Sequence, residues 1–106
     1  MTRRVILESP YAGDTKANTD YARRCLRDSL ARGEAPFASH LLYTQVLNDD
    51  SPDDRQQGID AGLVWMGMAE AVVVYCDLGI SAGMERGMDR AAILNIPMEM
   101  RRLNPK

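Results

Sequence analysis

Hydrophobic residues gather in four short runs along this chain, separated by longer segments with a different spacing. The first run covers residues 5–7 and is typical of a buried strand. A weaker run at 35–39 contains a proline, which restricts it to the start of a strand or to a sheet edge. The run at 71–76 is apolar throughout, as expected of a central strand that is covered on both faces. A last run near 97–100 predicts an edge strand, and residues 41–47 predict a short helical turn.

Three segments between these runs repeat their apolar residues every three or four positions, which indicates helices. The first helix is expected to begin at Asn18 as N-cap and to stop at Gly33. The second is expected to open at Ser51, because a proline follows directly and suits the first helical position. The third is capped by Ser81 and runs to about Leu94. Four side chains of the second helical segment are expected to point inward: Ile59, Leu63, Met66 and Met68.

Strands and helices thus alternate strictly, in the order β-α-β-α-β-α-β. Such alternation favours a parallel sheet with right-handed crossover connections and helices on both faces. The sequence therefore predicts an α/β fold, a flavodoxin-like or Rossmann-like three-layer sandwich with a four- to five-stranded parallel sheet. A chain of 106 residues can bury one modest core, so we expect a single domain over residues 1–106.

Charge and hydropathy narrow the classes of partner. The net charge of −2 leaves no broad basic surface for a nucleic-acid polymer. The longest apolar stretch, residues 71–76, is far too short to span a membrane, and the N-terminal residues lack the pattern of a signal peptide. We therefore expect a cytoplasmic protein that binds neither nucleic acid nor membrane.

Few residues of this chain could hold a metal ion. It has two cysteines, Cys25 and Cys76, and one histidine, which are too few soft ligands for a zinc site. In a cytoplasmic protein both cysteines are expected to be reduced and to act as small hydrophobic residues. We expect neither a metal nor another cofactor.

Ligands of open α/β sheets bind beyond the carboxyl ends of the strands, where the strand order reverses. In this chain those ends are residues 9–13 and 77–83, which are rich in small and hydroxyl residues and so let a ligand approach the backbone. The helix that begins at 81–83 offers free N–H groups to an anion such as a phosphate. The candidate substrate-binding residues are Ser9, Tyr11, Gly13, Asn18, His40, Ser81, Gly83 and Met84.

Each candidate also has a purely structural interpretation. Tyr11 either stacks on a base or sugar or covers its own loop, and His40 either faces the site or packs in the interior. Asn18 is first of all an N-cap. The candidate catalytic carboxylates are Asp77, which ends the central strand, and Glu85. The structural alternative for Glu85 is a first-turn acid that complements the helix dipole.

Three motifs follow one another along the chain: SPYAG at 9–13, W-x-x-x-AEAVVV at 65–74 and S-x-GM at 81–84. In this order they resemble nucleoside 2-deoxyribosyltransferase-like proteins, most closely small bacterial and phage members of uncharacterised function. The resemblance implies a flavodoxin-like fold, a homo-oligomer and a pocket for a nucleoside or nucleotide. It also implies cleavage or exchange of a base at the N-glycosidic bond, by attack of a carboxylate on the anomeric carbon.

The chain departs from that pattern at two acidic positions. Gly87 stands where the resemblance implies the nucleophilic glutamate, and Gly62 stands where relatives often carry an acid. Glu85 precedes Gly87 by two residues, which turns its side chain about 200° around the helix axis. Asp60 lies at a similar offset from Gly62.

Three functions therefore remain open. The first is a nucleotide-directed enzyme that uses Asp77 or Glu85 as its carboxylate. The second is a non-catalytic protein that binds a nucleotide or a nucleotide-derived signal, either as a sensor or to sequester it. Gly87 in place of the nucleophilic glutamate favours this second function. The third is an assembly protein with a vestigial pocket. Seven methionines and the apolar segment around Trp65 separately predict a homodimer or a higher homo-oligomer.

Overall fold

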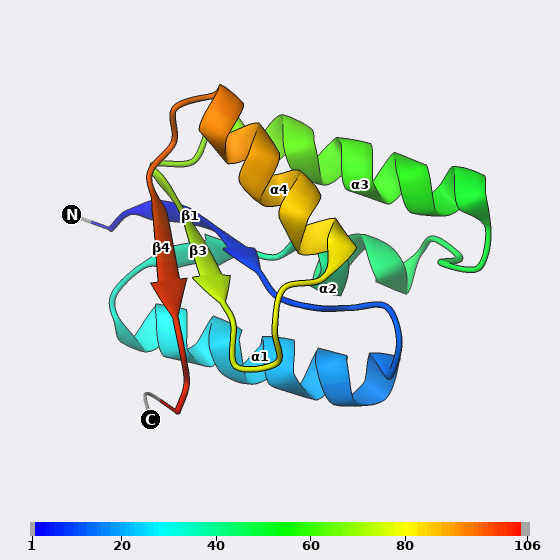
Figure 1. Ribbon diagram of the computed structural model, residues 1–106, viewed down its shortest axis with the longest axis horizontal. Helices are drawn as coiled ribbons and strands as arrows, with labels where there is room; N and C mark the ends of the chain where they lie inside the picture. The colour runs from blue at the N-terminus through cyan, green and yellow to red at the C-terminus, as the bar shows by residue number, and fades with distance from the viewer. Residues whose placement is uncertain (1, 105–106) are drawn as a thin grey trace.

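A computed structural model describes residues 2–104 of the chain. Its strands form one four-stranded parallel sheet in the order β2-β1-β3-β4. Helix α1 covers one face of this sheet, and helices α3 and α4 cover the other (Figure 1). The predicted three-layer α/β fold with a parallel sheet is confirmed. In chain order the elements are β1 (Arg4–Glu8), α1 (Thr15–Ala31), β2 (Ala35–Phe37), α2 (Ser39–Leu42), the 3-10 turn η1 (Tyr43–Gln45), α3 (Pro52–Met66), β3 (Ala71–Tyr75), α4 (Ala82–Ile93) and β4 (Met98–Arg101).

The two central strands divide the core into two halves. Every residue of β3 is buried, as the continuous apolar run predicted. Side chains alternate between the two faces of a strand. In β1, Val5 and Leu7 therefore pack toward α1, whereas Ile6 packs against Met66 of α3 and Met84 of α4. The two central strands are thus covered on both faces, and their parallel pairing places the carboxyl end of β1 beside that of β3.

The strand order reverses between β1 and β3. From β1 the chain moves outward to β2, then returns across the sheet to β3 and continues to β4 on the other side. Glu8, the last residue of β1, lies level with Val74 of β3. The switch point that the sequence placed at the ends of these two strands therefore lies where it was expected.

Helix α1 begins earlier than predicted. Its N-cap is Asp14, whose carboxylate accepts a hydrogen bond of 3.1 Å from the backbone N–H of Ala17. Asn18 lies inside the first turn, and its side chain donates hydrogen bonds of 3.0 Å to the carbonyls of Tyr11 and Ala12. The prediction of Asn18 as N-cap is wrong, because its amide stabilises the preceding loop instead of the helix end.

The inward position predicted for Met68 is also wrong. Helix α3 ends at Met66, which is buried, and Gly67 follows as the C-cap. Met68 lies in the turn after the helix, where the helical periodicity no longer applies, and its side chain is 60% exposed. Its backbone carbonyl accepts a hydrogen bond of 3.0 Å from Nε of Arg4, which holds this turn beside β1.

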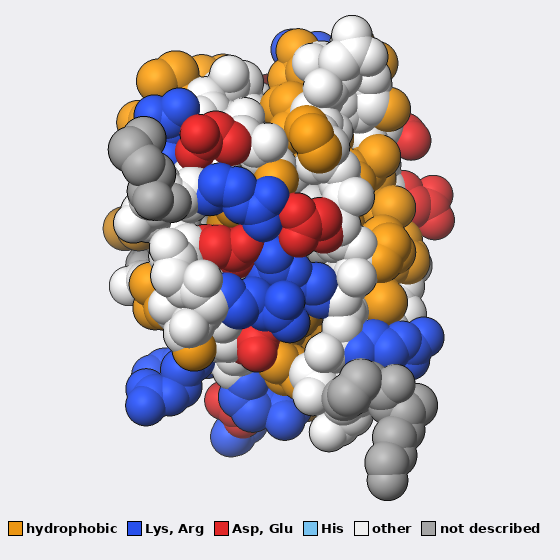
Figure 2. All heavy atoms as spheres, turned by 90° about the vertical axis from the view of Figure 1, so that its left-hand side faces the viewer, with side chains coloured by type: hydrophobic (Ala, Val, Ile, Leu, Met, Phe, Trp, Pro, Cys, Tyr) orange, Lys and Arg blue, Asp and Glu red, His pale blue; other side chains and the backbone are white. Residues whose placement is uncertain are grey.

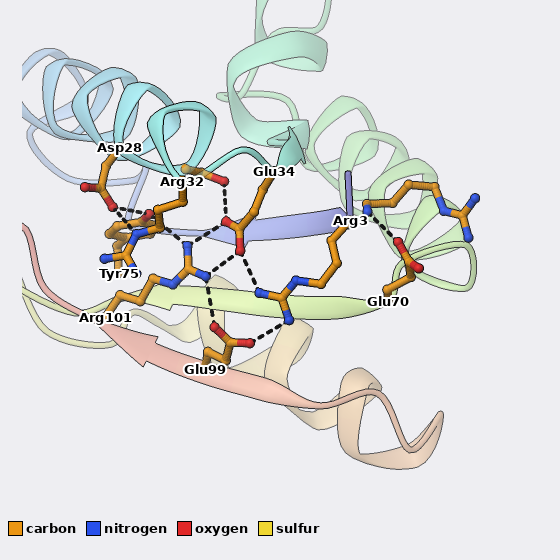
Figure 3. Close-up of polar contacts among 10 residues, drawn as sticks. Arg3, Asp28, Arg32, Glu34, Glu70, Tyr75, Glu99 and Arg101 are labelled. Carbon is orange, nitrogen blue, oxygen red and sulfur yellow. Dashed lines mark hydrogen bonds and ion pairs between the residues drawn. The ribbon is translucent and has the colours of Figure 1, made fainter. Parts of the chain in front are cut away.

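A cluster of four charged side chains lies on the α1 side of the sheet, beside the edge strand β4 (Figure 3). We call Arg3, Glu34, Glu99 and Arg101 the charged cluster. Arg101 lies level with Tyr75, which faces α1, so it points to the same side. Its guanidinium donates two parallel hydrogen bonds to Glu34, of 2.7 and 2.6 Å. This bidentate geometry ties β4 to the segment that precedes β2.

Every carboxylate of the charged cluster is paired. Arg3 donates to Glu34 over 2.6 Å and to Glu99 over 2.7 Å, and Arg101 donates to Glu99 over 2.9 Å. Ser29 donates a further hydrogen bond of 2.8 Å to Glu34. The hydrogen bonds from Arg101 are the largest cause that holds the pKa of Glu34 at about 2. Figure 2 views the molecule from the left-hand side of Figure 1 and shows basic and acidic side chains next to one another on this face.

Candidate functional site

A cavity of about 190 Å³ opens at the carboxyl ends of β1 and β2, between these strands and helices α2, α3 and α4. It therefore lies at the switch point. Ile6 and Phe37 supply strand side chains to its wall, and Ile59, Leu63 and Met66 supply one face of α3. Ligand pockets typically measure roughly 300–1,000 Å³, so the cavity suits a small ligand or one part of a larger ligand.

Glu8 is the carboxyl group that β1 directs into this cavity. It alternates with Leu7 and so points, like Ile6, toward α3 and α4. Its side chain has no hydrogen bond or ion pair with any other residue of the range 2–104. Burial raises the pKa of Glu8 from 4.5 to about 8, because a charged carboxylate loses its hydration there. The Glu8 carboxyl is therefore protonated at pH 7.

Gly87 of α4 lies directly against this carboxyl group. A Cβ atom on Gly87 would lie 2.6 Å from Cδ of Glu8 and 3.0 Å from Oε1, and it would approach Oε2 more closely still. Glycine inside a helix costs about 1 kcal/mol relative to alanine. The φ of Gly87 is not positive, so the conformational freedom of glycine does not explain the residue. Position 87 instead requires the absence of a side chain. The Glu8 carboxyl fills the space that a side chain at position 87 would occupy.

Ser9 and His40 form a polar pair on the cavity wall. Ser9 Oγ and His40 Nε2 lie 2.7 Å apart in a hydrogen bond whose donor depends on the histidine tautomer. Burial lowers the pKa of His40 from 6.5 to about 4, so the imidazole is neutral at pH 7. Both residues line the cavity, which thus contains a neutral imidazole as well as a neutral carboxyl group.

The N-terminus of α4 forms another part of the cavity. Ser81 is the N-cap, and its Oγ accepts a hydrogen bond of 3.2 Å from the backbone N–H of Met84. Ser81, Gly83 and Met84 all line the cavity, and Met84 also packs in the core. The structure therefore brings six of the predicted substrate-binding residues to one cavity: Ser9, Tyr11, His40, Ser81, Gly83 and Met84.

The other two predicted binding residues lie in the loop that leads into α1 and in its first turn. Gly13 has a φ of 104°, a conformation that glycine adopts readily, and it turns the chain after Tyr11. Asn18 holds the carbonyls of this loop through its side chain. Neither residue lines the cavity, so any contact of Gly13 or Asn18 with a ligand stays a prediction.

The two carboxylates suggested for catalysis also lie away from the cavity. Asp77 accepts hydrogen bonds from Tyr21 Oη at 2.6 Å and from the N–H groups of Leu103 and Asn104 at 2.8 and 3.0 Å. Burial alone raises the pKa of Asp77, but these hydrogen bonds outweigh it and hold the pKa at about 2. Glu85 is exposed on the first turn of α4. Their catalytic roles stay predictions.

Sequence reasoning missed Glu8, although one signal was present. A charged residue ends an otherwise buried apolar strand, at the edge where the site was expected. It also missed Arg55 of α3 and Arg86 of α4, which line both the cavity and an adjoining hollow near Asp49. In the part of the chain that the structure describes, neither arginine forms an ion pair.

Other kinds of site find little support in the described residues. Within residues 2–104, no three His, Cys, Asp or Glu side chains lie together as a metal site requires. Cys25 is buried and free, and burial raises the pKa of its thiol to about 12, which makes it unreactive. Over the same residues, no helix combines the length and the hydropathy needed to cross a membrane.

The structure is similar to that of a 2-deoxyribosyltransferase from Bacillus psychrosaccharolyticus, which is described as a biocatalyst for nucleoside synthesis. The TM-score is 0.68 at 17% sequence identity, over 97% of this chain and 74% of that one. At this identity the likeness establishes a shared fold, as the motifs predicted, and not a shared activity. A closer relation to small bacterial and phage proteins stays a prediction.

No curated protein matches the chain. A sequence family described as "Domain of unknown function (DUF7768)" matches residues 3–101, which include every strand and helix of the structure. The protein therefore belongs to the DUF7768 family.

Proposed function

We propose that the cavity binds a nucleoside or nucleotide and that the protein cleaves or exchanges the base at the N-glycosidic bond. The observation that carries this proposal is the mixed character of the cavity wall. Aromatic rings of Tyr11, Phe37 and Tyr43 offer surfaces on which a base can stack. Ser9 and His40 offer neutral hydrogen-bonding groups to a sugar or to the edge of a base.

The chemistry of this bond suits the groups that line the cavity. Breaking the bond between sugar and base requires a proton for the departing base and a nucleophile for the anomeric carbon. Glu8 holds a proton at pH 7, and the open cavity admits water or a second base. Similarity in fold to a 2-deoxyribosyltransferase supports the same class of ligand.

A second candidate function is binding of a nucleotide or a nucleotide-derived signal without turnover. The observation that favours it is Gly87, which leaves α4 without a carboxylate at the position where the resemblance implies a nucleophile. In this case the cavity retains its ligand intact, and the protein acts as a sensor or sequesters the ligand.

One experiment separates the two functions. The protein is incubated with a pool of nucleosides, nucleotides and dinucleotides, and mass spectrometry measures both the free bases and the compounds retained by the protein. We expect free base in excess of the protein concentration. An intact, retained nucleotide without free base supports the binding protein, and no change of the pool together with no retained compound contradicts both functions.

A matched pair of variants shows whether the cavity is responsible. A Cβ on Gly83 meets only Ser81 Oγ, at 3.9 Å, so Gly83→Phe can be accommodated while it obstructs the cavity. Asp89→Phe adds the same ring to an exposed position of α4 that does not line the cavity. We expect only Gly83→Phe to abolish base release and ligand retention. Equal effects of both variants would contradict the proposal.

We also propose a homo-oligomer. Three large apolar side chains at the end of α3 and just beyond it are exposed, Val64 by 76%, Trp65 by 51% and Met68 by 60%. Light scattering at micromolar concentration tests this, with a mass of at least twice the monomer expected and a monomer mass contradicting it.

A further inference from the structure

We infer that Glu8, at the end of β1, is the catalytic carboxyl of the cavity, and that it occupies the space of the side chain that α4 lacks at Gly87. This inference rests on the proposed function and assigns one of its residues. It places the reactive carboxyl on a strand, whereas the candidates from the sequence were Asp77, at the end of the central strand, and Glu85, in the following helix.

The contact between Glu8 and Gly87 is what carries the inference. A Cβ at position 87 would lie 2.6 Å from Cδ of Glu8, so a side chain at 87 and the Glu8 carboxyl exclude each other in this arrangement. Position 87 is also where the resemblance implies a carboxylate. The group therefore reaches the same part of the cavity from β1 instead of from α4.

The surroundings of Glu8 leave its carboxyl free to react. Glu8 has no hydrogen bond or ion pair within residues 2–104, unlike Asp77, whose oxygens are engaged by three donors. Among the described residues, every side-chain oxygen or nitrogen that solvent cannot reach has a hydrogen-bond partner. The Glu8 oxygens have no partner, so solvent must reach them, and they border the cavity. Glu8 is thus a partly buried carboxyl group without a hydrogen-bond partner at the wall of a cavity, which suits it to contact a ligand.

The proposed step is general acid catalysis. As the bond between C1′ and the base nitrogen breaks, its electron pair passes to the base, and the Glu8 carboxyl gives its proton to the base. The oxygen of a water molecule, or a nitrogen of a second base, then forms the new bond to C1′ and returns one proton to the Glu8 carboxylate. Hydrolysis or base exchange results, Glu8 regains its proton, and no covalent glycosyl-enzyme forms.

Several other titratable or charged groups face the same cavity. His40 comes from α2, Arg86 comes from α4, and Asp49, Asp54 and Arg55 come from α3 and the loop before it. Tyr11 and Tyr43 also line the wall. A variant of Glu8 must therefore be compared with wild type over a range of pH, because these groups remain in both proteins.

The test measures base release from pH 5 to pH 10 for wild type, Glu8→Gln, Gly87→Ala and, as a control, Asp89→Asn on the exposed side of α4. For wild type we expect the rate to fall about tenfold per pH unit above the pKa of Glu8, which is about 8. Glu8→Gln should lower the rate by about 10²-fold or more and remove this alkaline limb. Its affinity for the retained ligand should change by less than about threefold, since glutamine fills the same volume.

Gly87→Ala and the control sharpen the assignment. The added Cβ displaces the Glu8 carboxyl, so we expect a lower rate and a shifted alkaline limb, whereas Asp89→Asn should match wild type. If Glu8→Gln releases base at the wild-type rate with the same alkaline limb, the inference is wrong and the proposed function stands. If wild type itself releases no base, both the catalytic function and the role of Glu8 are contradicted.

Discussion

Glu34 is buried and Glu8 is partly buried, yet their surroundings shift their pKa values in opposite directions. In the charged cluster, hydrogen bonds from Arg101 and Arg3 hold the pKa of Glu34 at about 2. In the cavity no partner offsets the loss of hydration, and the pKa of Glu8 rises to about 8. Burial alone does not decide the charge of a carboxyl group, because its partners do.

The two glutamates also differ in what they can do. Glu34 has two arginines and Ser29 as donors, so its oxygens have no capacity left for a ligand and its role is to hold β4 against the rest of the fold. Glu8 borders a cavity and holds a proton that it can give away. Paired groups stabilise this molecule, whereas the unpaired group marks its candidate site.

The largest effect on stability is expected for Glu34→Gln. This change removes the buried counter-charge of the Arg101 guanidinium, which is only 7% exposed, and leaves it with Glu99, whose side chain is 40% exposed. Breaking one side of a buried ion pair costs about 3–5 kcal/mol in the free energy of unfolding. Urea denaturation at pH 7, followed by circular dichroism, measures it.

The control for Glu34→Gln is an exposed ion pair. Lys16 and Asp20 lie 3.7 Å apart, with side chains 89% and 65% exposed. Asp20→Asn should change the free energy of unfolding by less than about 0.5 kcal/mol, because solvent screens such pairs. Similar effects of Glu34→Gln and Asp20→Asn would show that the charged cluster contributes no more than surface charges do.

The next largest effect is the change in the free energy of unfolding with pH that Glu8 causes. Its pKa is raised from 4.5 to about 8, so the folded state binds this proton more tightly than the unfolded state does. The contribution of Glu8 is therefore fully present below pH 4.5 and is lost as the pH rises to about 8. Relative to Glu8→Gln, wild type should lose roughly 3 kcal/mol of unfolding free energy between pH 5 and pH 8.

The comparison with Glu8→Gln is needed because His40 acts in the opposite direction. Burial lowers the pKa of His40 to about 4, so its contribution to stability grows as the pH rises from about 4 to 6.5. His40 is present in both proteins, and its effect cancels in the difference. Parallel stability profiles of wild type and Glu8→Gln would mean that Glu8 has an ordinary pKa.

A smaller effect is expected for Asp77→Asn. Asparagine has only one acceptor oxygen, so it cannot accept all the hydrogen bonds that Asp77 receives from Tyr21, Leu103 and Asn104. The free energy of unfolding should fall by about 1–3 kcal/mol. Urea denaturation measures this loss, and a loss of base release by the folded variant would instead support the catalytic role that the sequence suggested for Asp77.

The sequence predicted the order of strands and helices because each buried element leaves a local pattern. The apolar run of β3 and the caps Ser51 and Ser81 identify elements without any tertiary information. The start of α1 was harder to predict, since Asp14 and Asn18 are both good N-cap residues, four positions apart. Only the contact of Asn18 with the preceding loop decides between them.

The site could be predicted only in part, because its decisive contact is not local. The sequence located the switch-point loops and identified Gly87 as a departure from the family pattern. It could not show that Glu8 fills the space at Gly87, since the two residues are far apart in the chain and meet only through the packing of α4 on β1. The pKa of Glu8 depends on that same packing.

The proposed role of Glu8 requires an unpaired, protonated carboxyl at the cavity wall. Carbon-13 NMR of the glutamate side-chain carboxyl groups measures this protonation, with Glu8→Gln and Glu34→Gln used to assign the two resonances. We expect Glu8 to titrate near pH 8, while Glu34 stays ionised down to about pH 2. If the Glu8 carboxyl titrates near its ordinary value of 4.5, it is ionised at pH 7 and cannot act as the general acid.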